Sequence, residues 1–309
     1  MPSSFFDTLV FSGGAMEAAA FIGCLRRLEE EQEENENEKP LSFVTTVAGT
    51  SAGAVMALCF ALGMRSSELE RWCSVRTVEC EVCRVDADAI IQLFDTLGID
   101  DGSGLVRFLG DLLWERLGVR DLTFGELAKK KRKNGLVICA SDIVSATPMY
   151  FEAATTPDVS VVAAVRASTC VPLMYAPVRI GGRTYVDGSL FENVPLGFLA
   201  TRSPPSDSTG VRRCLALRLP RSPPPPPTDM TTYAWCLASS LLRRTNAMCD
   251  AHPPDGVTVL DVAEENDGRE EGITSFCSRS LQFRVDQKKL REKVEMGHRV
   301  MSAFLQRIS

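Results

Sequence analysis

The first apolar positions of the chain follow the pattern of a strand, a loop and a helix. Residues 8–12 form a short run of apolar and β-branched side chains, which predicts a strand. From residue 17 to residue 31 apolar side chains recur every three or four positions, which predicts a helix with one buried face. That face carries Ala20, Phe21, Cys24, Leu25 and Leu28. Gly13 and Gly14 separate the two elements, so the chain begins with one β-loop-α unit.

A second unit of the same kind follows. Residues 43–48 form an apolar, β-branched run, and residues 52–64 form an apolar helical run. The sequence Gly49-Thr50-Ser51-Ala52-Gly53 joins them. A strand, a sharp turn and a helix in succession expose a serine oxygen at the top of a sheet, so this context predicts a nucleophile elbow at Ser51. The two glycines fit that geometry because the turn leaves little room for a Cβ. The pentapeptide alone also fits an ordinary strand-to-helix connection.

Further helices and short strands are predicted along the rest of the chain. Helices are predicted near residues 67–72, 87–97, 104–117 and 121–127, the last with a capping sequence. Strands are predicted at residues 135–140, 150–152, 179–180, 184–186 and 214–219. Gly181-Gly182 predicts a hairpin turn. The tail, residues 285–308, carries a helical apolar stripe that Gly297 is expected to interrupt.

Composition narrows the class of protein. The 309 residues are 45% hydrophobic and 24% charged, which suits one large α/β domain. The formal net charge of -6 gives no general attraction to nucleic acid, so nucleic acid is not expected as a partner. The longest apolar stretch, residues 52–64, is shorter than the roughly 18 residues that a transmembrane helix needs. The first residues lack the pattern of a secretory signal. We therefore expect a cytoplasmic protein, with transient contact to a membrane surface left open.

The eleven cysteines fit a reducing compartment. Their number is odd, and most of them lie inside apolar runs, as reduced core cysteines do. Cys73, Cys80 and Cys83 offer three thiolates but no nearby histidine and no second Cys-x-x-Cys, so a zinc site is not predicted.

Five basic residues run from Lys129 to Lys133. They fit an exposed turn between a predicted helix and a predicted strand. A nuclear localisation signal and a contact for anionic head groups have the same pattern.

A serine needs an adjacent base before it acts as a nucleophile. The chain has two histidines, His252 before a Pro-Pro pair and His298 in the tail, and neither has a distinctive neighbourhood. A Ser-Asp-His order would be met by Ser51, then Asp187 or Asp142, then one of these histidines. The alternative is a carboxylate that acts directly on the serine. Asp187 is best placed for that role because it ends a short strand and precedes a glycine, although an Asp-Gly pair alone also predicts a turn.

Three short blocks occur in order along the chain. They are Gly13-Gly14-Ala15-Met16, Gly49-Thr50-Ser51-Ala52-Gly53 and Asp187-Gly188-Ser189. In this order and at these separations they resemble the patatin-like phospholipase family, lipid acyl hydrolases with a serine-aspartate dyad. The segments Ala164-Val165-Arg166-Ala167-Ser168, Val171-Pro172 and Asn193-Val194-Pro195-Leu196 also look like the family. The resemblance spans residues 8–200, and the joint occurrence of the blocks is far more specific than any single motif.

This resemblance implies a role for each candidate site residue. Ser51 would be the nucleophile and Asp187 its general base. The loop of Gly13, Gly14 and Ala15 would supply the N–H groups of an oxyanion hole. The glycines that support the motifs are Gly49, Gly53 and Gly188. The implied reaction is acyl transfer to the serine and then to water, and it needs no metal and no organic cofactor.

The glycine loop departs from the family's pattern of three glycines, one variable residue, Arg or Lys, and Gly. This chain has Ala15, Glu17 and Ala18 at the third, fifth and sixth positions. Ala15 adopts a positive φ only at a cost, so the loop could sit differently. Glu17 would oppose an oxyanion if it faced the site, and would be favourable at a helix N-terminus if it faced solvent. A catalytically impaired relative that still binds lipid is therefore an alternative to the active enzyme.

Together these patterns predict one domain over residues 1–309, with three α/β/α layers around a central, largely parallel sheet. Residues 8–200 would form its motif-bearing core, and residues 201–309 a C-terminal extension with proline-rich loops and a terminal helix. The expected activity is phospholipase A-type or general lipid acyl hydrolysis, with a lipid or another acyl ester as substrate. The sequence indicates no oligomeric state.

Overall fold

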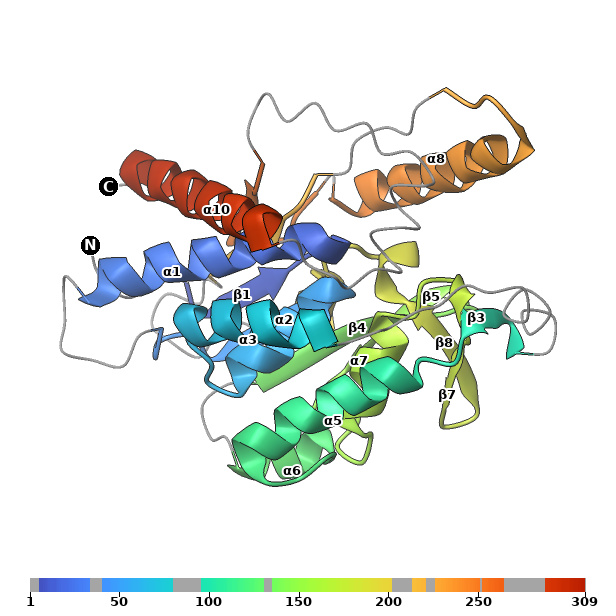
Figure 1. The fold of residues 1–309 in the computed structure, drawn as a ribbon, viewed down its shortest axis with the longest axis horizontal. Coiled ribbons are helices and arrows are strands. Elements are labelled where there is room, and N and C mark those ends of the chain that lie inside the picture. The colour runs from blue at the N-terminus through green and yellow to red at the C-terminus, as the bar shows by residue number, and fades with distance from the viewer. Residues whose placement is uncertain are drawn as a thin grey trace.

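A mixed sheet of eight strands forms the centre of the computed structural model, which describes residues 6–33, 41–79, 96–130, 135–201, 213–220, 226–250, 252–263 and 287–308. The strand order is β10-β9-β1-β2-β4-β8-β7, and β5 also pairs with β4. Strands β10, β9, β1, β2 and β4 are parallel, whereas β5, β7 and β8 pair in antiparallel fashion. Helices pack around this sheet (Figure 1). The predicted α/β fold with a largely parallel sheet is confirmed.

The strands are short, and most coincide with predicted runs. Those of the main sheet are β1 Thr8–Phe11, β2 Thr46–Thr50, β4 Gly135–Asp142, β5 Thr147–Phe151, β7 Val178–Ile180, β8 Arg183–Asp187, β9 Cys214–Arg218 and β10 Val257–Asp261. A separate parallel pair consists of β3 Gly98–Asp100 and β6 Leu173–Tyr175. The predicted hairpin between β7 and β8 is present, and Gly181 and Gly182 both have a positive φ there.

The helices lie mostly in the connections between strands. The α-helices are α1 Ala19–Glu33, α2 Ala52–Ala61, α3 Ser66–Glu79, α5 Ser103–Leu117, α6 Phe124–Lys130, α7 Val161–Ser168, α8 Met230–Asp250 and α10 Gln287–Ile308. Three short 3-10 helices are η1 Ala15–Ala18, η2 Gly188–Leu190 and η3 Gly197–Thr201. Among the described helices, none combines the length and the hydropathy that a membrane span requires.

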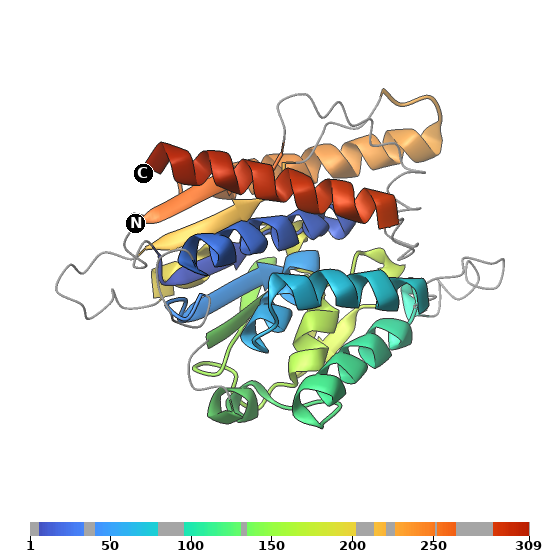
Figure 2. The ribbon, with the colours of Figure 1, turned by 60° about the vertical axis from the view of Figure 1, so that its left-hand side comes forward.

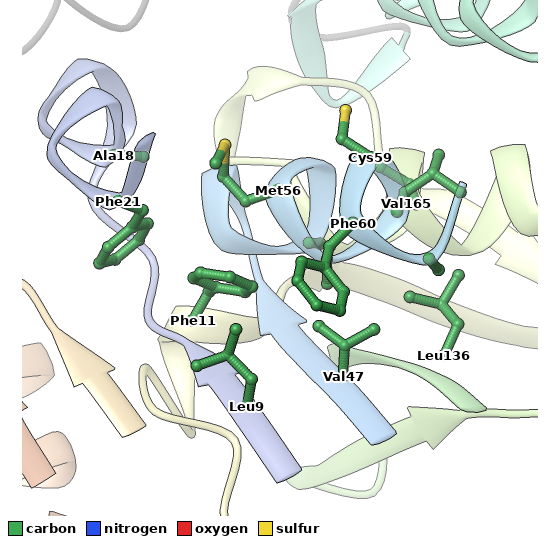
Figure 3. Packing of buried hydrophobic residues seen from close by; sticks show 14 of the residues in the cluster. Leu9, Phe11, Ala18, Phe21, Val47, Met56, Cys59, Phe60, Leu136 and Val165 are labelled. Carbon is green, nitrogen blue, oxygen red and sulfur yellow. The ribbon is translucent and has the colours of Figure 1, made fainter. Parts of the chain in front are cut away.

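One face of the sheet packs against α1 and α2. Leu9, Phe11 and Val47 point from β1 and β2 toward these helices (Figure 3). The ring of Phe11 lies 5.2 Å from that of Phe21 in α1, measured between centroids. Helix α2 contacts β1, β2, β4 and α7, so it is enclosed, which explains why its sequence is apolar on all sides.

The opposite face of the sheet packs against a segment that follows Asp187 in the chain. Strand residues with side chains on this face are Val10, Ala48, Val137 and Ala216. They contact Val194, Leu196, Phe198 and Leu199, which lead into η3 or lie within it. Because residues 194–199 are buried against the sheet, they fix the end of the loop that follows Asp187.

Helix α10 runs alongside α1, and the two approach closely at glycines (Figure 2). A Cβ on Gly23 would lie 1.8 Å from the carbonyl oxygen of Val294, and a Cβ on Gly297 would lie 1.8 Å from that of Ala20. The predicted tail helix is present as α10, which is continuous from Gln287 to Ile308, and the stripe expected to be interrupted at Gly297 is buried on both sides of that glycine and at it. A glycine is required at position 297 because the backbones of α1 and α10 are in contact there.

Several described elements were not recognised in the sequence. They are β3, β6, β10, α7 and α8. Strands of three residues carry too few positions to show a period. Helix α7 is rich in β-branched and small residues, and the α8 residues described as buried, Ser239 and Asn246, are polar, so neither helix shows the usual stripe of buried apolar positions among its described side chains.

Four predictions lie wholly or partly outside the described residues, and the proline-rich loops predicted in the C-terminal extension are one of them. The helix predicted at 87–97 falls there except for its last two residues, which precede β3. Lys129 and Lys130 end α6 as exposed residues, whereas the rest of the basic run falls outside. Cys80 and Cys83 also fall outside. The single-domain prediction over residues 1–309 stays a prediction.

Candidate active site

Ser51 lies in the sharp turn between β2 and α2. Its backbone has φ 55° and ψ −125°, a conformation that a non-glycine residue adopts only at a cost in free energy. A Cβ on Gly49 would lie 2.1 Å from the carbonyl oxygen of Gly53, and a Cβ on Gly53 would lie 2.5 Å from that of Phe11. The two glycines therefore allow β2, α2 and the end of β1 to pack closely enough to hold the serine in this conformation.

The side chain of Ser51 contacts Asp187 directly. Its Oγ donates a hydrogen bond to Asp187 Oδ2 over 2.7 Å, between residues 136 positions apart in the sequence. The Ser51 N–H donates to Ser168 Oγ over 2.9 Å, and Ser168 Oγ donates to the carbonyl of Cys139 over 2.5 Å. The structure thus brings together the residues predicted as nucleophile and base, and α7 and β4 add support through Ser168.

Strand pairing places Asp187 level with the end of β2. Asp187 lies opposite Ala140 where β8 pairs with β4, and Thr50 lies opposite Cys139 where β2 pairs with β4. The ends of β8 and β2 are therefore one residue apart along β4. Asp187 is 3% exposed, so its carboxylate is in contact with protein and not with bulk water.

The Asp-Gly-Ser block orients the carboxylate of Asp187. Its Oδ1 accepts hydrogen bonds from the N–H of Ser189 over 2.9 Å and from Ser189 Oγ over 2.6 Å. These bonds leave Oδ2 directed at Ser51. A Cβ on Gly188 would lie 2.4 Å from the Cys139 carbonyl oxygen, so a glycine is needed for the chain to turn here.

Neither histidine contacts the Ser51–Asp187 pair. His252 is exposed and forms no hydrogen bond with the described residues. In α10, His298 pairs with Glu30, with 2.7 Å between Nε2 and Oε2. Asp142, the other carboxylate considered, pairs with the guanidinium of Arg183 at 3.1 Å. A Ser-Asp-His arrangement is therefore absent from the described residues, which include both histidines of the chain.

The loop of Gly13, Gly14 and Ala15 lies against Ser51. A Cβ on Gly13 would lie 3.2 Å from the Ser51 Cβ and 2.7 Å from Asn193 Oδ1. The N–H of Gly13 donates to the carbonyl of Asn193 over 3.1 Å. The N–H groups of Gly14 and Ala15 have no acceptor among the described residues. The predicted role of Gly13, Gly14 and Ala15 as oxyanion donors stays a prediction, in which the N–H of Gly13 is already bound to a carbonyl.

Ala15 adopts a glycine-like backbone conformation. Its φ is 46°, in the left-handed region, which costs an L-residue with a Cβ roughly 1–2 kcal/mol. The loop around it is held on both sides, because the Glu17 N–H donates to the carbonyl of Gly14 over 3.0 Å and the Leu219 N–H donates to Ser12 Oγ over 2.9 Å. Alanine at this position therefore does not prevent a positive φ.

Glu17 pairs with a lysine of the C-terminal helix. Its Oε2 lies 2.9 Å from Lys293 Nζ, and the two side chains are 14% and 23% exposed. Of the two orientations considered for Glu17, the solvent-facing one is not found, because the side chain is mostly buried against Lys293. The reason is tertiary: α10 packs along α1 and brings a cation to the carboxylate. The negative charge introduced at this loop position is balanced by a positive charge nearby.

Asn246 of α8 is a supporting residue that sequence reasoning missed. Its Oδ1 accepts from the Asn193 N–H over 2.8 Å, and its Nδ2 donates to the Ser189 carbonyl over 3.1 Å. It therefore bridges the two ends of the segment that follows Asp187. No local pattern marks it, because its partners lie 53 and 57 positions away in the sequence.

The described cysteines match the interpretation as reduced core residues. Burial raises the pKa of the Cys24 and Cys59 thiols, so both stay neutral. Cys73 is a free thiol. Within the described part of the chain, no cluster of His, Cys, Asp and Glu side chains could hold a metal ion.

The chain matches the model of one protein family. The family is described as patatin-like phospholipase, and the match covers residues 9–200. This region contains Ser51, Asp187 and the Gly13 loop.

Curated relatives and one solved structure give a similar picture. "Probable lipid hydrolase 463L" of Invertebrate iridescent virus 6 is 24% identical over 195 residues, which are 62% of each chain. "Uncharacterized protein YqhO" of Bacillus subtilis (strain 168) is 30% identical over 205 residues, 60% of this chain and 64% of YqhO. The match thus spans less than two thirds of these curated relatives. VipD from Legionella pneumophila superposes with a TM-score of 0.51 at 14% identity, covering 98% of this chain and 67% of VipD, which shows a shared fold.

Proposed function

Because the chain belongs to the patatin-like phospholipase family, we propose that it hydrolyses acyl ester bonds of lipids, with Ser51 as nucleophile and Asp187 as general base. One observation carries the assignment of roles: Ser51 Oγ donates a 2.7 Å hydrogen bond to a buried Asp187 carboxylate whose other oxygen is bound by Ser189. A base within this distance of a serine hydroxyl can take its proton as the oxygen attacks.

The reaction proceeds in two acyl-transfer steps. Asp187 takes the proton of Ser51 while Oγ attacks the ester carbonyl and forms a tetrahedral intermediate. The intermediate expels the alcohol, which receives the proton from Asp187, and leaves an acyl ester on Ser51. Water then attacks this ester with the same base, and the free acid leaves. The products are one alcohol and one carboxylic acid, and no metal or organic cofactor takes part.

Backbone N–H groups would stabilise the negative charge on the carbonyl oxygen. Gly14 and Ala15 are proposed as donors, because their N–H groups have no acceptor among the described residues and their loop lies against Ser51. Loss of one such donor typically costs about 100- to 1000-fold in rate. The conformation of this loop is therefore as important to turnover as the dyad.

Hydrolysis of phospholipid and of a short-chain ester by the purified protein tests the proposal. Ser51→Ala is expected to lower the rate at least about 1000-fold, and Asp187→Asn at least about 100-fold. Asp142→Asn is the matched control, because Asp142 is another buried carboxylate on the neighbouring strand that does not contact Ser51. It should leave the rate within about threefold of the unsubstituted protein.

The competing possibility is a lipid-binding relative without turnover, suggested by Ala15 and Glu17. The described geometry weakens that possibility, since Ala15 reaches a positive φ and Glu17 is paired with Lys293. It would be established if the unsubstituted protein hydrolysed lipid no faster than Ser51→Ala while still binding it. A histidine-dependent enzyme would be indicated if replacing both His252 and His298 were as damaging as Asp187→Asn.

A further inference from the structure

Helix α8 presents an apolar face to solvent. Met230, Tyr233, Leu237 and Leu241 follow one another at spacings of three and four residues, so they lie on one side of the helix. Their exposed fractions are 78%, 48%, 50% and 71%. These four residues are called the α8 stripe below. Helix α8 lies at the periphery of the molecule, beyond the end of α1 that follows β1 (Figure 1).

Two polar residues on the opposite face of α8 are buried. Ser239 and Asn246 lie two turns apart on that face, and both are buried. A surface helix normally buries its apolar side chains and exposes its polar ones, as α10 does with Leu290, Val294 and Met301 inside. Among the α8 side chains that the structure describes, the α8 stripe is exposed while Ser239 and Asn246 are buried. Packing against the described residues therefore does not explain why the stripe is apolar.

The buried face attaches α8 to the loop that carries Asp187. Asn246 bonds to the Ser189 carbonyl and to the Asn193 N–H, and Ser189 in turn bonds to the Asp187 carboxylate. Helix α8 also contacts η2, which begins directly after Asp187. The α8 stripe is thus carried by a helix fixed beside the candidate dyad.

A second exposed apolar group is attached to the same loop. Leu97 and Leu173 are 59% and 68% exposed, and pairing of β3 with β6 brings them together because Gly98 lies opposite Leu173. Leu173 follows a short turn after Cys170, whose carbonyl accepts the Asp187 N–H over 2.8 Å. Both leucines have a positive φ, 60° and 70°, so the chain accepts backbone strain while leaving large apolar side chains in water.

Arg244 adds a positive charge to the face of the α8 stripe. It lies three residues after Leu241 and seven after Leu237, so it projects from the same side of the helix. It is exposed and forms no ion pair with any described residue. Residues 230–249 contain no aspartate or glutamate. This face therefore combines apolar side chains with an unbalanced cation, which is the combination that suits phospholipid head groups and the acyl chains beneath them.

We propose that the α8 stripe, together with Leu97 and Leu173, docks the protein on the surface of a phospholipid membrane, with Arg244 facing the lipid phosphates. The proposal rests on the proposed lipid hydrolase function. Both apolar groups are attached to the loop of Asp187, so a membrane that covers them meets the candidate dyad and supplies its substrate.

Binding to phospholipid vesicles tests the surface separately from catalysis. The full chain carrying Ser51→Ala is sedimented with vesicles of phosphatidylcholine and phosphatidylserine, so that hydrolysis does not alter them. Adding Leu237→Ser and Leu241→Ser is expected to lower the partition coefficient at least about tenfold, because less apolar surface is buried in the membrane. Adding Arg244→Glu should weaken binding to these vesicles and leave binding to pure phosphatidylcholine within about twofold.

A matched control removes exposed apolar residues elsewhere. Val106 and Trp114 of α5 are also exposed, and Val106→Ser with Trp114→Ser should leave binding unchanged. Equal binding by the α8 and α5 variants would overturn the proposal. So would a dimer in gel filtration that the α8 variant converts to a monomer, since the occupant would then be a second copy.

Turnover of a soluble short-chain ester separates this proposal from the proposed function. The α8 substitutions, made without Ser51→Ala, should leave that turnover within about twofold while hydrolysis of vesicle lipid falls with binding. Vesicle binding that depends on the α8 stripe, in a protein without esterase activity, would support the docking surface and defeat the hydrolase. Esterase activity without vesicle binding would do the opposite.

Discussion

Two loops meet at Ser51, and different parts of the chain hold them. The turn between β2 and α2 is held locally, because Gly49 and Gly53 let adjacent backbone segments pack in contact. The Gly13 loop is held from a distance. Its Ala15 has a positive φ without being glycine, and Glu17 is paired with Lys293, 276 positions further along the chain. The comparison teaches that one backbone conformation can be fixed by a short motif or by tertiary contacts, and only the first is visible in the sequence.

The largest effect is expected from adding a methyl group to the locally held turn. In Gly53→Ala the new Cβ would lie 2.5 Å from two backbone carbonyl oxygens, those of Phe11 and Ser12, and neither can move freely. We expect a loss of about 2–4 kcal/mol in the free energy of unfolding, with esterase activity at background, as measured by urea denaturation and ester hydrolysis. Gly135→Ala is the control, since its Cβ would make ordinary contacts at 3.7 Å. Equal stability of the two variants would show that the turn is not tightly packed.

A smaller effect is expected at the contact between α10 and α1, the helix that follows the Gly13 loop. In Gly297→Ala the Cβ would lie 1.8 Å from the Ala20 carbonyl oxygen, so α10 must move away from α1. We expect the free energy of unfolding to fall by about 2 kcal/mol, together with a decrease in esterase activity through the Gly13 loop. Reduced stability with full activity would show that α10 stabilises the domain without positioning that loop.

Charge substitutions at Glu17 and Lys293 test whether α10 supports the Gly13 loop through this ion pair. Lys293→Ala leaves a mostly buried carboxylate without its cation, and we expect a loss of about 1–2 kcal/mol in the free energy of unfolding. Glu17→Lys should also destabilise, because it places two cations together. Lys293→Glu should destabilise as well, because it places two carboxylates together. Combining Glu17→Lys with Lys293→Glu should recover at least half of the stability and activity lost in either of these two single variants. Additive losses in this double-mutant cycle would argue against a direct pairing.

The smallest effect concerns the strained residue of the Gly13 loop. Ala15→Gly should raise the free energy of unfolding by about 0.5 kcal/mol, because relief of the positive φ exceeds the extra entropy of an unfolded glycine. Ala18→Gly is the matched control with the opposite sign. Ala18 lies in η1 without a positive φ, so glycine there should cost about 0.5–1 kcal/mol. A loss of stability in Ala15→Gly would mean that the loop does not need a left-handed residue at this position.

Much of the fold could be predicted from periodicity alone. Residues 8–12, 43–48 and 135–140 are short apolar runs of the kind that buried strands form, and the structure has β1 and β4 in the first and last of them and β2 from Thr46 onward. The reason for Gly297 in the tail helix could not be predicted. This glycine interrupts the apolar stripe in the sequence, and only the packing of α10 against Ala20 shows why the helix needs a glycine there.

The candidate site could be predicted in part. Ser51 stood out because it follows a predicted strand between two glycines, and Asp187 because it ends a predicted strand before a glycine. The structure places the two in contact. Their catalytic roles stay a prediction. The residues that position them could not be identified from the sequence. Asn246 and Lys293 act on partners far away in sequence, and a search for apolar stripes does not find a buried polar residue such as Asn246.

Covalent labelling of Ser51 tests the central claim most directly. A fluorophosphonate ester reacts with a serine whose hydroxyl is activated by a base, and peptide mass spectrometry locates the adduct. We predict a single adduct on Ser51 in the unsubstituted protein, none in Ser51→Ala, a labelling rate at least about 100-fold lower in Asp187→Asn, and an unchanged rate when His252 and His298 are both replaced by alanine. Labelling of Ser51 that is as fast in Asp187→Asn as in the unsubstituted protein would contradict the Ser51–Asp187 dyad.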